Sequence, residues 1–330
     1  MCRPILTIII PTYNRAKNLT ILLKTIDWEL SGTDDMVRII IGDNNSGDET
    51  DQVIRAFTES HPKTVVVKHK SNVGADENFC RCIELVSTRF FWIIGDDDRP
   101  LTGSLKNIVG ILNDQLPDIL YINSKWDKKI QPPLTQEVNV AIIAQRYNRE
   151  NFSKKINIWV SYISGVIINV ERLYFLNSGI NIRRFHGSFL VQLGWVLPLL
   201  MTGNRFYIIK RRCILATANN SGGYKLLEVF GCNFPSILSN FCGLKTPEFK
   251  AIYRPLVWGF LPGLVWAARS NKNANFIKEN ILGSIKNLQS SASYLIILRP
   301  LIELPYILAL LLFTIYRIIR KIISYYNKLK

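Results

Sequence analysis

The sequence is poor in the residues that build metal clusters and disulfide frameworks. Its 330 residues include three histidines and six cysteines, and only Cys80 and Cys82 are close together. A Cys-x-Cys pair with scattered histidines does not have the spacing of a zinc site. We therefore expect reduced, mostly buried thiols in a cytosolic protein, because a free cysteine behaves as a small hydrophobic residue.

Negative charge is almost missing from the second half of the chain, where no aspartate follows Asp127. Residues 1–150 carry 18 lysines and arginines against 20 aspartates and glutamates, whereas residues 151–330 carry 23 against 5. An acidic half suits metal or sugar chemistry. A basic, apolar half suits an anionic surface, either nucleic acid or membrane. The charge split therefore predicts that the two halves have different tasks.

Signals of several other protein classes are absent. The N-terminal apolar run is interrupted by Pro11 and lacks a small-residue cleavage site, so we expect no signal peptide. No G-x-G-x-x-G follows a predicted strand, which disfavours a dinucleotide oxidoreductase. No nucleic-acid-binding module is recognisable and the basic residues do not form one stripe, so we expect no nucleic-acid partner.

Short apolar segments alternate with amphipathic segments up to residue 125. We expect strands at 5–10, 37–41, 64–68, 90–94 and 119–122, and helices at 18–26, 48–57, 76–86 and 104–112. This alternation predicts βαβ units, and hence an α/β fold with a mostly parallel sheet covered by helices on both faces. The later expectations are a loop at 126–160, a strand at 161–169, helices at 170–176 and 189–201, a strand at 205–209, and helices from residue 249.

Polar clusters follow three of the predicted strands: residues 11–15 (PTYNR), residues 42–46 (GDNNS) and residues 95–98 (GDDD). The carboxyl ends of parallel strands share the edge of the sheet where α/β proteins bind ligands. Adjacent carboxylates repel one another, so a folded protein tolerates three of them best with a cation or solvent. Hard oxygen ligands of this kind suit Mg²⁺ or Mn²⁺, with a diphosphate completing the shell.

Structural explanations remain open for several of these residues. Asp48 can cap the helix that follows it, Asn72 and Gly74 can form a turn before a helix, and Arg15 can be a surface cation. The acidic triplet can be a solvated turn. Asp43 lies on the strand side of its turn and is not needed as a cap, so its carboxylate is available for a base imide or a ribose hydroxyl.

Four motifs in this order resemble the family-2 glycosyltransferases of GT-A fold. They are residues 11–15, residues 43–46 with Asp48, residues 72–74 with Asn78, and residues 95–98, so the resemblance covers about residues 5–125. With an Asn-Asn-Ser stretch at residues 219–221 and the basic C-terminus, the chain looks most like bacterial O-antigen transferases of the abequosyltransferase type. The resemblance implies sugar transfer from a nucleotide-diphosphate donor to a saccharide acceptor, with Mn²⁺ or Mg²⁺ as cofactor.

The same resemblance implies roles for single residues. A nucleotide pocket is shaped by Pro11, Thr12 and Tyr13, Arg15 approaches the diphosphate, and Asp43 holds the base. Other donor-site positions are Asn72, Gly74, Asn78, Asp96 and Asp97. Asp96 and Asp98 form the metal motif, with Asp98 as the direct ligand. Asp97 holds the ribose or the donor sugar and is counted with the catalytic residues.

The catalytic base departs from the family pattern. Inverting members usually take an Asp or Glu from the second half, often in a Glu-Asp pair, and this chain has no such pair. We expect His186 to be the base, because a neutral imidazole can accept the proton of an attacking hydroxyl. Asp127 is the second candidate, and a structural role for His186 is the alternative. Direct displacement through an oxocarbenium-like transition state, with inversion, is what the family implies.

The C-terminal segment combines apolar and basic residues. Residues 305–316 form an uncharged stretch that is shorter than the roughly 20 residues needed to span a bilayer. Five cations follow: Arg317, Arg320, Lys321, Lys328 and Lys330. This mixture favours a helix lying in the headgroup region of an anionic leaflet, with a transmembrane helix and a core helix as alternatives.

We therefore expect a nucleotide-sugar-binding half at 1–125, an acceptor-side half at 126–248 and a helical membrane-associating region at 249–330. The expected partners are a nucleotide-sugar donor, a polyprenyl-diphosphate-linked saccharide and an anionic membrane surface. The expected location is the cytoplasmic face of the bacterial inner membrane, as a peripheral or monotopic protein. One rival is a non-catalytic membrane-anchored sugar- or nucleotide-binding protein. Another is a metal-dependent phosphohydrolase, which would need Asp-x-Asp where Ile10-Pro11-Thr12 stands.

Overall fold

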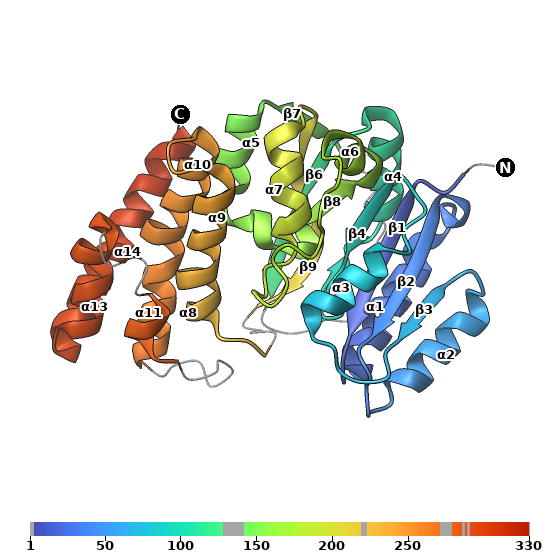
Figure 1. The fold of residues 1–330 in the computed structure, drawn as a ribbon, viewed down its shortest axis with the longest axis horizontal. Coiled ribbons are helices and arrows are strands. Elements are labelled where there is room, and N and C mark those ends of the chain that lie inside the picture. The colour runs from blue at the N-terminus through green and yellow to red at the C-terminus, as the bar shows by residue number, and fades with distance from the viewer. Residues whose placement is uncertain are drawn as a thin grey trace. The chain divides into compact units, whose positions relative to one another are not determined.

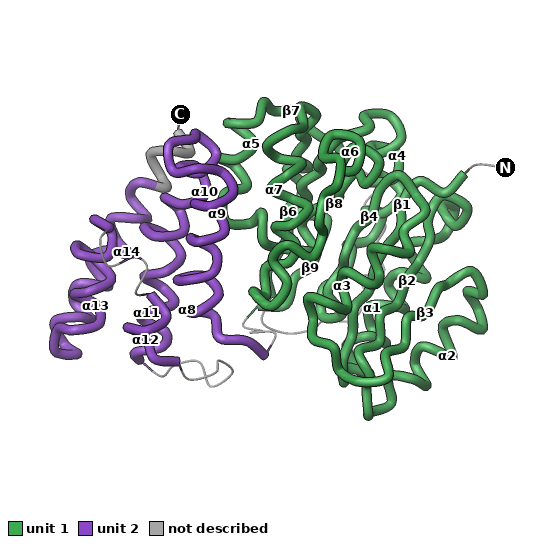
Figure 2. Tube along the Cα trace, in the orientation of Figure 1, with its two compact units in different colours: residues 1–218 green, residues 219–330 purple. Residues whose placement is uncertain are grey.

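The computed structural model describes residues 3–127, 142–218, 223–270, 279–285, 288 and 291–329, with side chains up to residue 323. Its chain divides into two compact units, residues 1–218 and 219–330 (Figure 2). The boundaries expected at residues 125 and 248 divide the chain by function and not by compactness, so they stay a prediction. The Asn-Asn-Ser stretch at 219–221, Cys2 and Lys330 lie outside the described residues, as does the side chain of Lys328.

One mixed sheet organises the first unit (Figure 1). Its strand order is β3-β2-β1-β4-β8-β6-β9-β5, and β7 also pairs with β9. The bounds are β1 (Leu6–Thr12), β2 (Val37–Asp43), β3 (Val65–Lys68), β4 (Phe90–Ile93), β5 (Arg99–Pro100), β6 (Ile119–Asp127), β7 (Ala144–Tyr147), β8 (Val166–Asn169) and β9 (Phe206–Thr217). The first four strands are parallel, which confirms the predicted α/β fold with a mostly parallel sheet.

Strand directions place the ends of β4, β6 and β9 at one edge. β8 is antiparallel to both β4 and β6, so β4 and β6 run the same way. β9 is parallel to β6. Residues that end these three strands therefore lie at the same edge as those that end β1 and β2.

Helices cover both faces of the sheet. The bounds are α1 (Ala16–Leu30), α2 (Thr50–Ser60), α3 (Ala75–Ile83), α4 (Ser104–Gln115), α5 (Arg149–Ile156), α6 (Val170–Leu176) and α7 (Leu193–Thr202). Apolar residues of α1, α2 and α4 share a core with Leu6, Ile8 and Ile10 of β1. The pleat turns Ile9 to the opposite face. Burying each such side chain stabilises the fold by about 1.5–3 kcal/mol.

Several expected element bounds were wrong in the second half of this unit. The expected loop at 126–160 contains β7 and α5, and β6 continues to Asp127. The expected strand at 161–169 is shortened to β8 because residues 163–165 form a 3-10 turn, η3 (Ile163–Gly165). The expected strand at 205–209 extends as β9 to Thr217. The pairing of β9 with β6 extends β9 beyond residue 209. This pairing is a long-range contact that the local sequence pattern does not reveal.

The second unit is helical and begins earlier than residue 249. Its elements are α8 (Leu226–Glu228), α9 (Phe234–Cys242), α10 (Pro247–Pro255), α11 (Leu261–Ser270), α12 (Ile281–Ser284), α13 (Arg299–Glu303) and α14 (Tyr306–Leu329). The π-helical segments η4 (Val229–Asn233), η5 (Leu256–Phe260) and η7 (Tyr294–Leu298) join several of them. Prolines at 235, 255, 262 and 300 flank these segments. A proline lacks the N–H of the helical ladder, so a locally widened turn accommodates it.

Candidate active site

The acidic triplet follows β4, in the middle of the sheet. Asp96 is buried and accepts hydrogen bonds from Thr12 Oγ1 at 2.8 Å and from Arg15 Nη1 at 2.8 Å. Arg15 also lies 3.5 Å from Asp97 Oδ2. The neighbouring carboxylates raise the pKa of Arg15, although its burial acts the other way. The structure thus brings Thr12 and Arg15 to Asp96, which lies 84 and 81 residues further along the chain.

Asp98 is held by residues from later in the first unit. Its Oδ2 accepts from the Tyr162 hydroxyl at 2.8 Å, and its Oδ1 accepts from the Thr217 backbone N–H at 3.0 Å. Thr217 Oγ1 also donates to the Asp97 carbonyl at 2.6 Å. Ser164 Oγ, which accepts from the Gly95 N–H at 2.9 Å, fixes the start of the motif. The triplet is therefore a rigid, mostly buried group rather than a solvated turn.

The chemistry of the triplet fits a divalent cation. Burial raises the pKa of Asp96 to about 6, and burial together with Asp97 raises that of Asp98 to about 7. A cation would remove the cost of ionising these carboxyl groups. Within the described residues, no group of three or more His, Cys, Asp or Glu side chains could hold a metal. Asp98 and Asp96 would therefore supply one or two ligands and a diphosphate the rest, as is usual for Mg²⁺.

Asp43 ends β2 and is fully buried. Its Oδ1 accepts from the Ser46 N–H at 3.0 Å, whereas its Oδ2 is buried without a hydrogen-bond partner. Leaving a buried acceptor unpaired costs about 1–3 kcal/mol, and a charged one costs more. Such an oxygen suits a ligand that donates an N–H or O–H.

Two asparagines join the loops around Asp43. Asn44 Nδ2 donates to Asn72 Oδ1 at 2.8 Å, and Asn44 Oδ1 accepts from the Val73 N–H at 2.8 Å. Gly74 has φ +84°, a conformation that favours glycine, and its N–H donates to Asn72. Asp48 bonds the N–H of Ala16 at 3.1 Å and that of Thr50 at 3.1 Å, so it links the first turns of α1 and α2.

Not every expected donor-site residue reaches the open edge. Asn78 is buried, with its amide between the Gly42 carbonyl and His69 Nε2, both at 2.9 Å. A Cβ on Gly42 would come within 2.5 Å of Asn78 Oδ1, so this contact needs glycine. Pro11 is buried within β1, while Tyr13 is exposed beyond its end. The contacts of Asn78 thus position β2.

His186 lies beside α3. Its Nε2 is 3.8 Å from Glu77 Oε2, and 47% of its side chain is exposed. Its loop is tied to α3, because Asp76 Oδ2 accepts from the N–H groups of Gly187 at 2.8 Å and Phe189 at 3.1 Å. Burial raises the pKa of Asp76. No described contact joins His186 to the triplet, so its role as the base stays a prediction, as does that of Asp127 at the end of β6.

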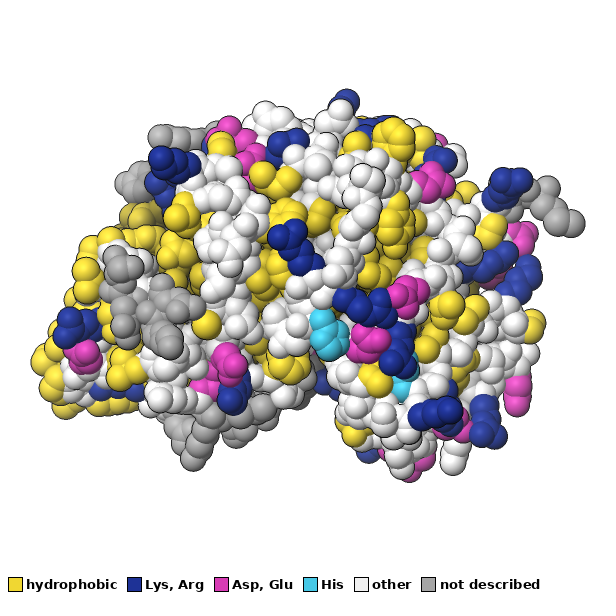
Figure 3. All heavy atoms as spheres, in the orientation of Figure 1, with side chains coloured by type: hydrophobic (Ala, Val, Ile, Leu, Met, Phe, Trp, Pro, Cys, Tyr) yellow, Lys and Arg dark blue, Asp and Glu magenta, His cyan; other side chains and the backbone are white. Residues whose placement is uncertain are grey.

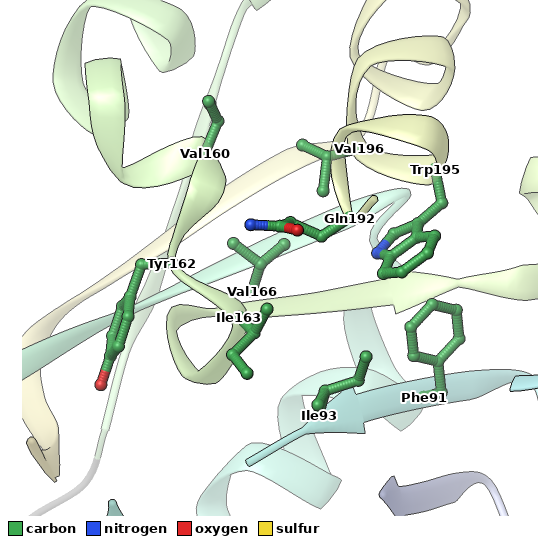
Figure 4. Close-up of a pocket in the computed structure, with 9 residues that line it drawn as sticks. All are labelled: Phe91, Ile93, Val160, Tyr162, Ile163, Val166, Gln192, Trp195 and Val196. Atoms are coloured by element: carbon green, nitrogen blue, oxygen red, sulfur yellow. The ribbon is translucent and has the colours of Figure 1, made fainter. Parts of the chain in front are cut away.

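A small cavity lies between β4, β8 and α7 (Figure 4). Its walls are mainly apolar and it has room for about one water molecule. Gln192 Nε2 is already bonded to the Ser161 carbonyl at 2.7 Å. The Tyr162 hydroxyl points away from the other lining residues in Figure 4. The cavity is therefore a packing gap, and the polar end of Tyr162 belongs to the acidic triplet.

Sequence reasoning missed the residues that hold the triplet from the second half: Tyr162, Ser164 and Thr217. They come from segments that were expected to be strand interior or lay beyond an expected strand. Their contacts arise because antiparallel β8 and the long β9 return to the edge. No motif in the sequence marks them.

Comparison with known proteins gives a family match. The model described as Glycosyl transferase family 2 matches residues 7–173. Abequosyltransferase RfbV of Salmonella typhimurium is 33% identical over 107 residues, which are 32% of each chain. The processive diacylglycerol beta-glycosyltransferase of Mycoplasma pneumoniae is 25% identical over 126 residues, which cover 36% of this chain and 35% of the relative. The chain thus spans about a third of the length of the curated relatives it matches.

Solved structures share the fold. S. aureus TarS 1–349 in complex with UDP-GlcNAc has a TM-score of 0.60 at 17% identity, covering 96% of this chain and 92% of that chain. The mannosyltransferase PcManGT from Pyrobaculum calidifontis, in complex with GDP-Man and Mn²⁺, has a TM-score of 0.53 at 15% identity, covering 96% and 87%. At these identities the likeness establishes the GT-A type fold.

Proposed function

The chain belongs to glycosyl transferase family 2, and on that premise we propose that it moves a sugar from a nucleoside-diphosphate donor to a saccharide acceptor. One juxtaposition carries the proposal. The unpartnered Asp43 oxygen and the buried triplet lie at the same edge, at the ends of β2 and β4 with only β1 between them. Asp43 would accept from the base, and the triplet would face the diphosphate. TarS and PcManGT, each solved with a nucleotide sugar, support this class of donor.

Metal dependence is part of the proposal. Asp98 would be the direct ligand, with Asp96 beside it, because two carboxyl groups with raised pKa values next to Asp97 favour a cation. Mg²⁺ or Mn²⁺ held by these two carboxylates would screen the charge that develops on the departing diphosphate. The Mn²⁺ in the PcManGT complex supports this choice. The Arg15 guanidinium favours the ionised form of Asp96 against the effect of burial and orients this carboxylate through its hydrogen bond.

The reaction is a direct displacement with inversion. The acceptor oxygen bonds to the anomeric carbon while the bond from that carbon to the diphosphate oxygen breaks, and the electron pair leaves with the diphosphate. His186 takes the hydroxyl proton. Glu77, 3.8 Å away, would orient the imidazole and stabilise the imidazolium that forms. Asp127 is the alternative base.

The acceptor is a polyprenyl-diphosphate-linked saccharide, in synthesis of an O-antigen type of polysaccharide. The match to an abequosyltransferase supports an O-antigen type of sugar transfer. The exposed face of α14 supports contact with an anionic membrane. Its apolar residues Ile307, Leu311, Ile318 and Ile322 are each at least half exposed, and Figure 3 shows hydrophobic side chains gathered over α13 as well. Such a protein would work at the cytoplasmic face of the inner membrane, as a peripheral or monotopic protein.

The described residues contain no helix with the length and apolarity needed to cross a bilayer. The helix α14 has a packed side, where Phe313 stacks on Trp266 at 5.0 Å, and an open side. A helix with one apolar face open to solvent suits the lipid headgroup boundary.

A nucleotide-sugar screen tests the function. Purified protein is incubated with each of a panel of nucleotide sugars, Mn²⁺ and a polyprenyl-diphosphate-linked saccharide, and free nucleoside diphosphate is measured. We expect release that depends on both donor and acceptor. Binding without release from any donor would favour the non-catalytic rival. Release of inorganic phosphate from simple phosphoesters would favour the phosphohydrolase.

A further inference from the structure

Three aromatic side chains meet at the edge of the sheet that carries the acidic triplet. Trp126, in β6, lies 5.3 Å from Trp159 and 5.0 Å from Tyr162, measured between ring centroids. Trp159 belongs to the 3-10 helix η2 (Asn157–Ser161) and lies 6.3 Å from Tyr162 in an edge-to-face arrangement. Trp126 is 45% exposed. We call these three residues the aromatic platform.

One hydrogen bond joins the aromatic platform to the triplet, and a second joins the strand beside the platform to the same carboxylate. The Tyr162 hydroxyl donates to Asp98 at 2.8 Å. Trp126 pairs with Ala216 of β9, and the next residue, Thr217, donates its N–H to Asp98 at 3.0 Å. The rings therefore lie one side chain away from the carboxylate assigned to the diphosphate, on elements of the same compact unit.

The aromatic platform lies on the opposite side of the triplet from Asp43. Along the sheet, β2 is two strands to one side of β4, and β6 is two strands to the other. At about 4.8 Å per strand, about 19 Å separates β2 from β6. A nucleotide base held by Asp43 therefore cannot reach these rings. A substrate group on the other side of the reacting centre can reach them.

We propose that Trp126, with Trp159 and Tyr162, is a stacking platform for a pyranose ring of the saccharide acceptor, an inference that rests on the proposed function. One face of a pyranose presents C–H groups, which pack on the negative face of an aromatic ring, while its hydroxyls stay in water. A half-exposed indole with anchored neighbours provides such a face. The aromatic platform binds the acceptor and takes no part in the proton transfer, which is assigned to His186 or Asp127.

Saturation-transfer NMR tests this with methyl glycosides of glucose, galactose, mannose, rhamnose and N-acetylglucosamine, in the presence of UDP, CDP or GDP with Mn²⁺. At least one pyranoside should bind wild-type protein. Trp126→Ala should weaken the binding of that pyranoside tenfold or more, and Trp126→Phe should weaken it less. Trp28→Ala is the matched control, because Trp28 is 56% exposed in the last turn of α1, at the other edge of the sheet. Trp159→Ala repeats the test if Trp126→Ala fails to fold.

Titration with nucleoside diphosphates and nucleotide sugars separates the possible failures. We expect Trp126→Ala to leave the affinity of both unchanged within twofold. A lower affinity for the nucleotide sugar alone would place the donor sugar on the platform and overturn the acceptor assignment. Wild-type protein that binds nucleotide but no pyranoside, or equal losses in Trp126→Ala and Trp28→Ala, would overturn the platform. Wild-type protein that binds no nucleotide would overturn the proposed function itself.

Discussion

Asp43 provides the sharpest test at the scale of single residues. Its Oδ1 is used by the Ser46 N–H and its buried Oδ2 has no partner. In Asp43→Asn the amide nitrogen replaces an acceptor with a donor, so a base N–H loses its partner. We expect nucleotide affinity to fall by about 1–3 kcal/mol, or about 5- to 150-fold, by isothermal titration, with an unchanged fold. Asp114→Asn, at an exposed position in α4, should bind like wild type; equal affinities in all three proteins would remove Asp43 from the site.

Asp98 tests the metal at the same scale. Asp98→Asn removes the charge but keeps a side chain of the same size beside Tyr162 and Thr217. Because burial raises the pKa of this carboxyl to about 7, losing its charge should not lower the melting temperature. We expect Mn²⁺-stimulated transfer to be lost, while Asp27→Asn, on the exposed surface of α1, stays active. Full wild-type activity in the presence of EDTA would contradict the metal role.

Residue identities were predictable from the sequence where a motif directly follows a strand. Thr12, Arg15, Asp96 and Asp98 were expected at one edge, and hydrogen bonds join Thr12 and Arg15 to Asp96 there. The partners of Asp98 were not predictable, because Tyr162 and Thr217 lie 64 and 119 residues further along the chain. The family resemblance implied a place for Asn78 in the donor site; its side chain is buried in α3 and donates to the Gly42 carbonyl, and its role in donor binding stays a prediction.

The loop that carries His186 is the element whose position matters most for the reaction. Asp76 holds two of its N–H groups, and Arg183 forms ion pairs with Glu77 and Glu84. Asp76→Ala should leave two N–H groups without a partner and loosen the loop from α3, at a cost of about 1–3 kcal/mol. We expect faster hydrogen exchange over residues 181–189 and slower transfer with an unchanged nucleotide affinity.

Glu84→Ala is the control for the loop, because Glu84 is half exposed and its ion pair is worth little in water. It should change exchange and transfer only slightly. If Asp76→Ala exchanges like wild type, the loop is held by other contacts. If exchange rises but transfer is unchanged, the position of the loop does not matter for the reaction and His186 is not the base.

Element types were predictable over residues 5–125 because strands and helices there have short, regular spacing. Beyond residue 125 the strand ends depend on long-range pairing: β6 and β9 extend each other, and β7 pairs with the start of β9. The helices of the second unit were recognisable by composition, but their π-helical joints follow from proline chemistry in packed helices. The local sequence pattern therefore does not predict these strand ends or these π-helical segments.

The whole molecule is proposed to divide its work between a nucleotide-binding sheet and a membrane-facing helix. In the second unit, Ala309 and Phe313 give α14 a packed side, whereas Ile307 is 78% exposed and Leu311 57%. Ile307→Glu with Leu311→Glu should therefore reduce sedimentation with phosphatidylglycerol-containing vesicles at least fivefold and leave the melting temperature within a few degrees of wild type. Arg317 and Lys321 would add about 1 kcal/mol each near an anionic surface, so high salt should weaken binding only in part.

Phe175→Glu is the matched control for the vesicle experiment, because Phe175 is 78% exposed on α6 of the first unit. It should sediment like wild type. If the double variant sediments like wild type as well, α14 is not the membrane contact. If both variants are released from the vesicles equally, vesicle binding is a nonspecific effect of exposed apolar surface.

Isothermal titration of UDP, CDP, TDP and GDP, each with and without Mn²⁺, tests the central claim most directly. The arrangement of Asp43 and Asp98 at one edge predicts that at least one nucleoside diphosphate binds wild-type protein, more tightly with Mn²⁺. Asp98→Asn should lose the effect of Mn²⁺ but keep the metal-free affinity, and Asp43→Asn should bind more weakly in both conditions. No binding of any nucleoside diphosphate, or an affinity that neither variant changes, would contradict the account.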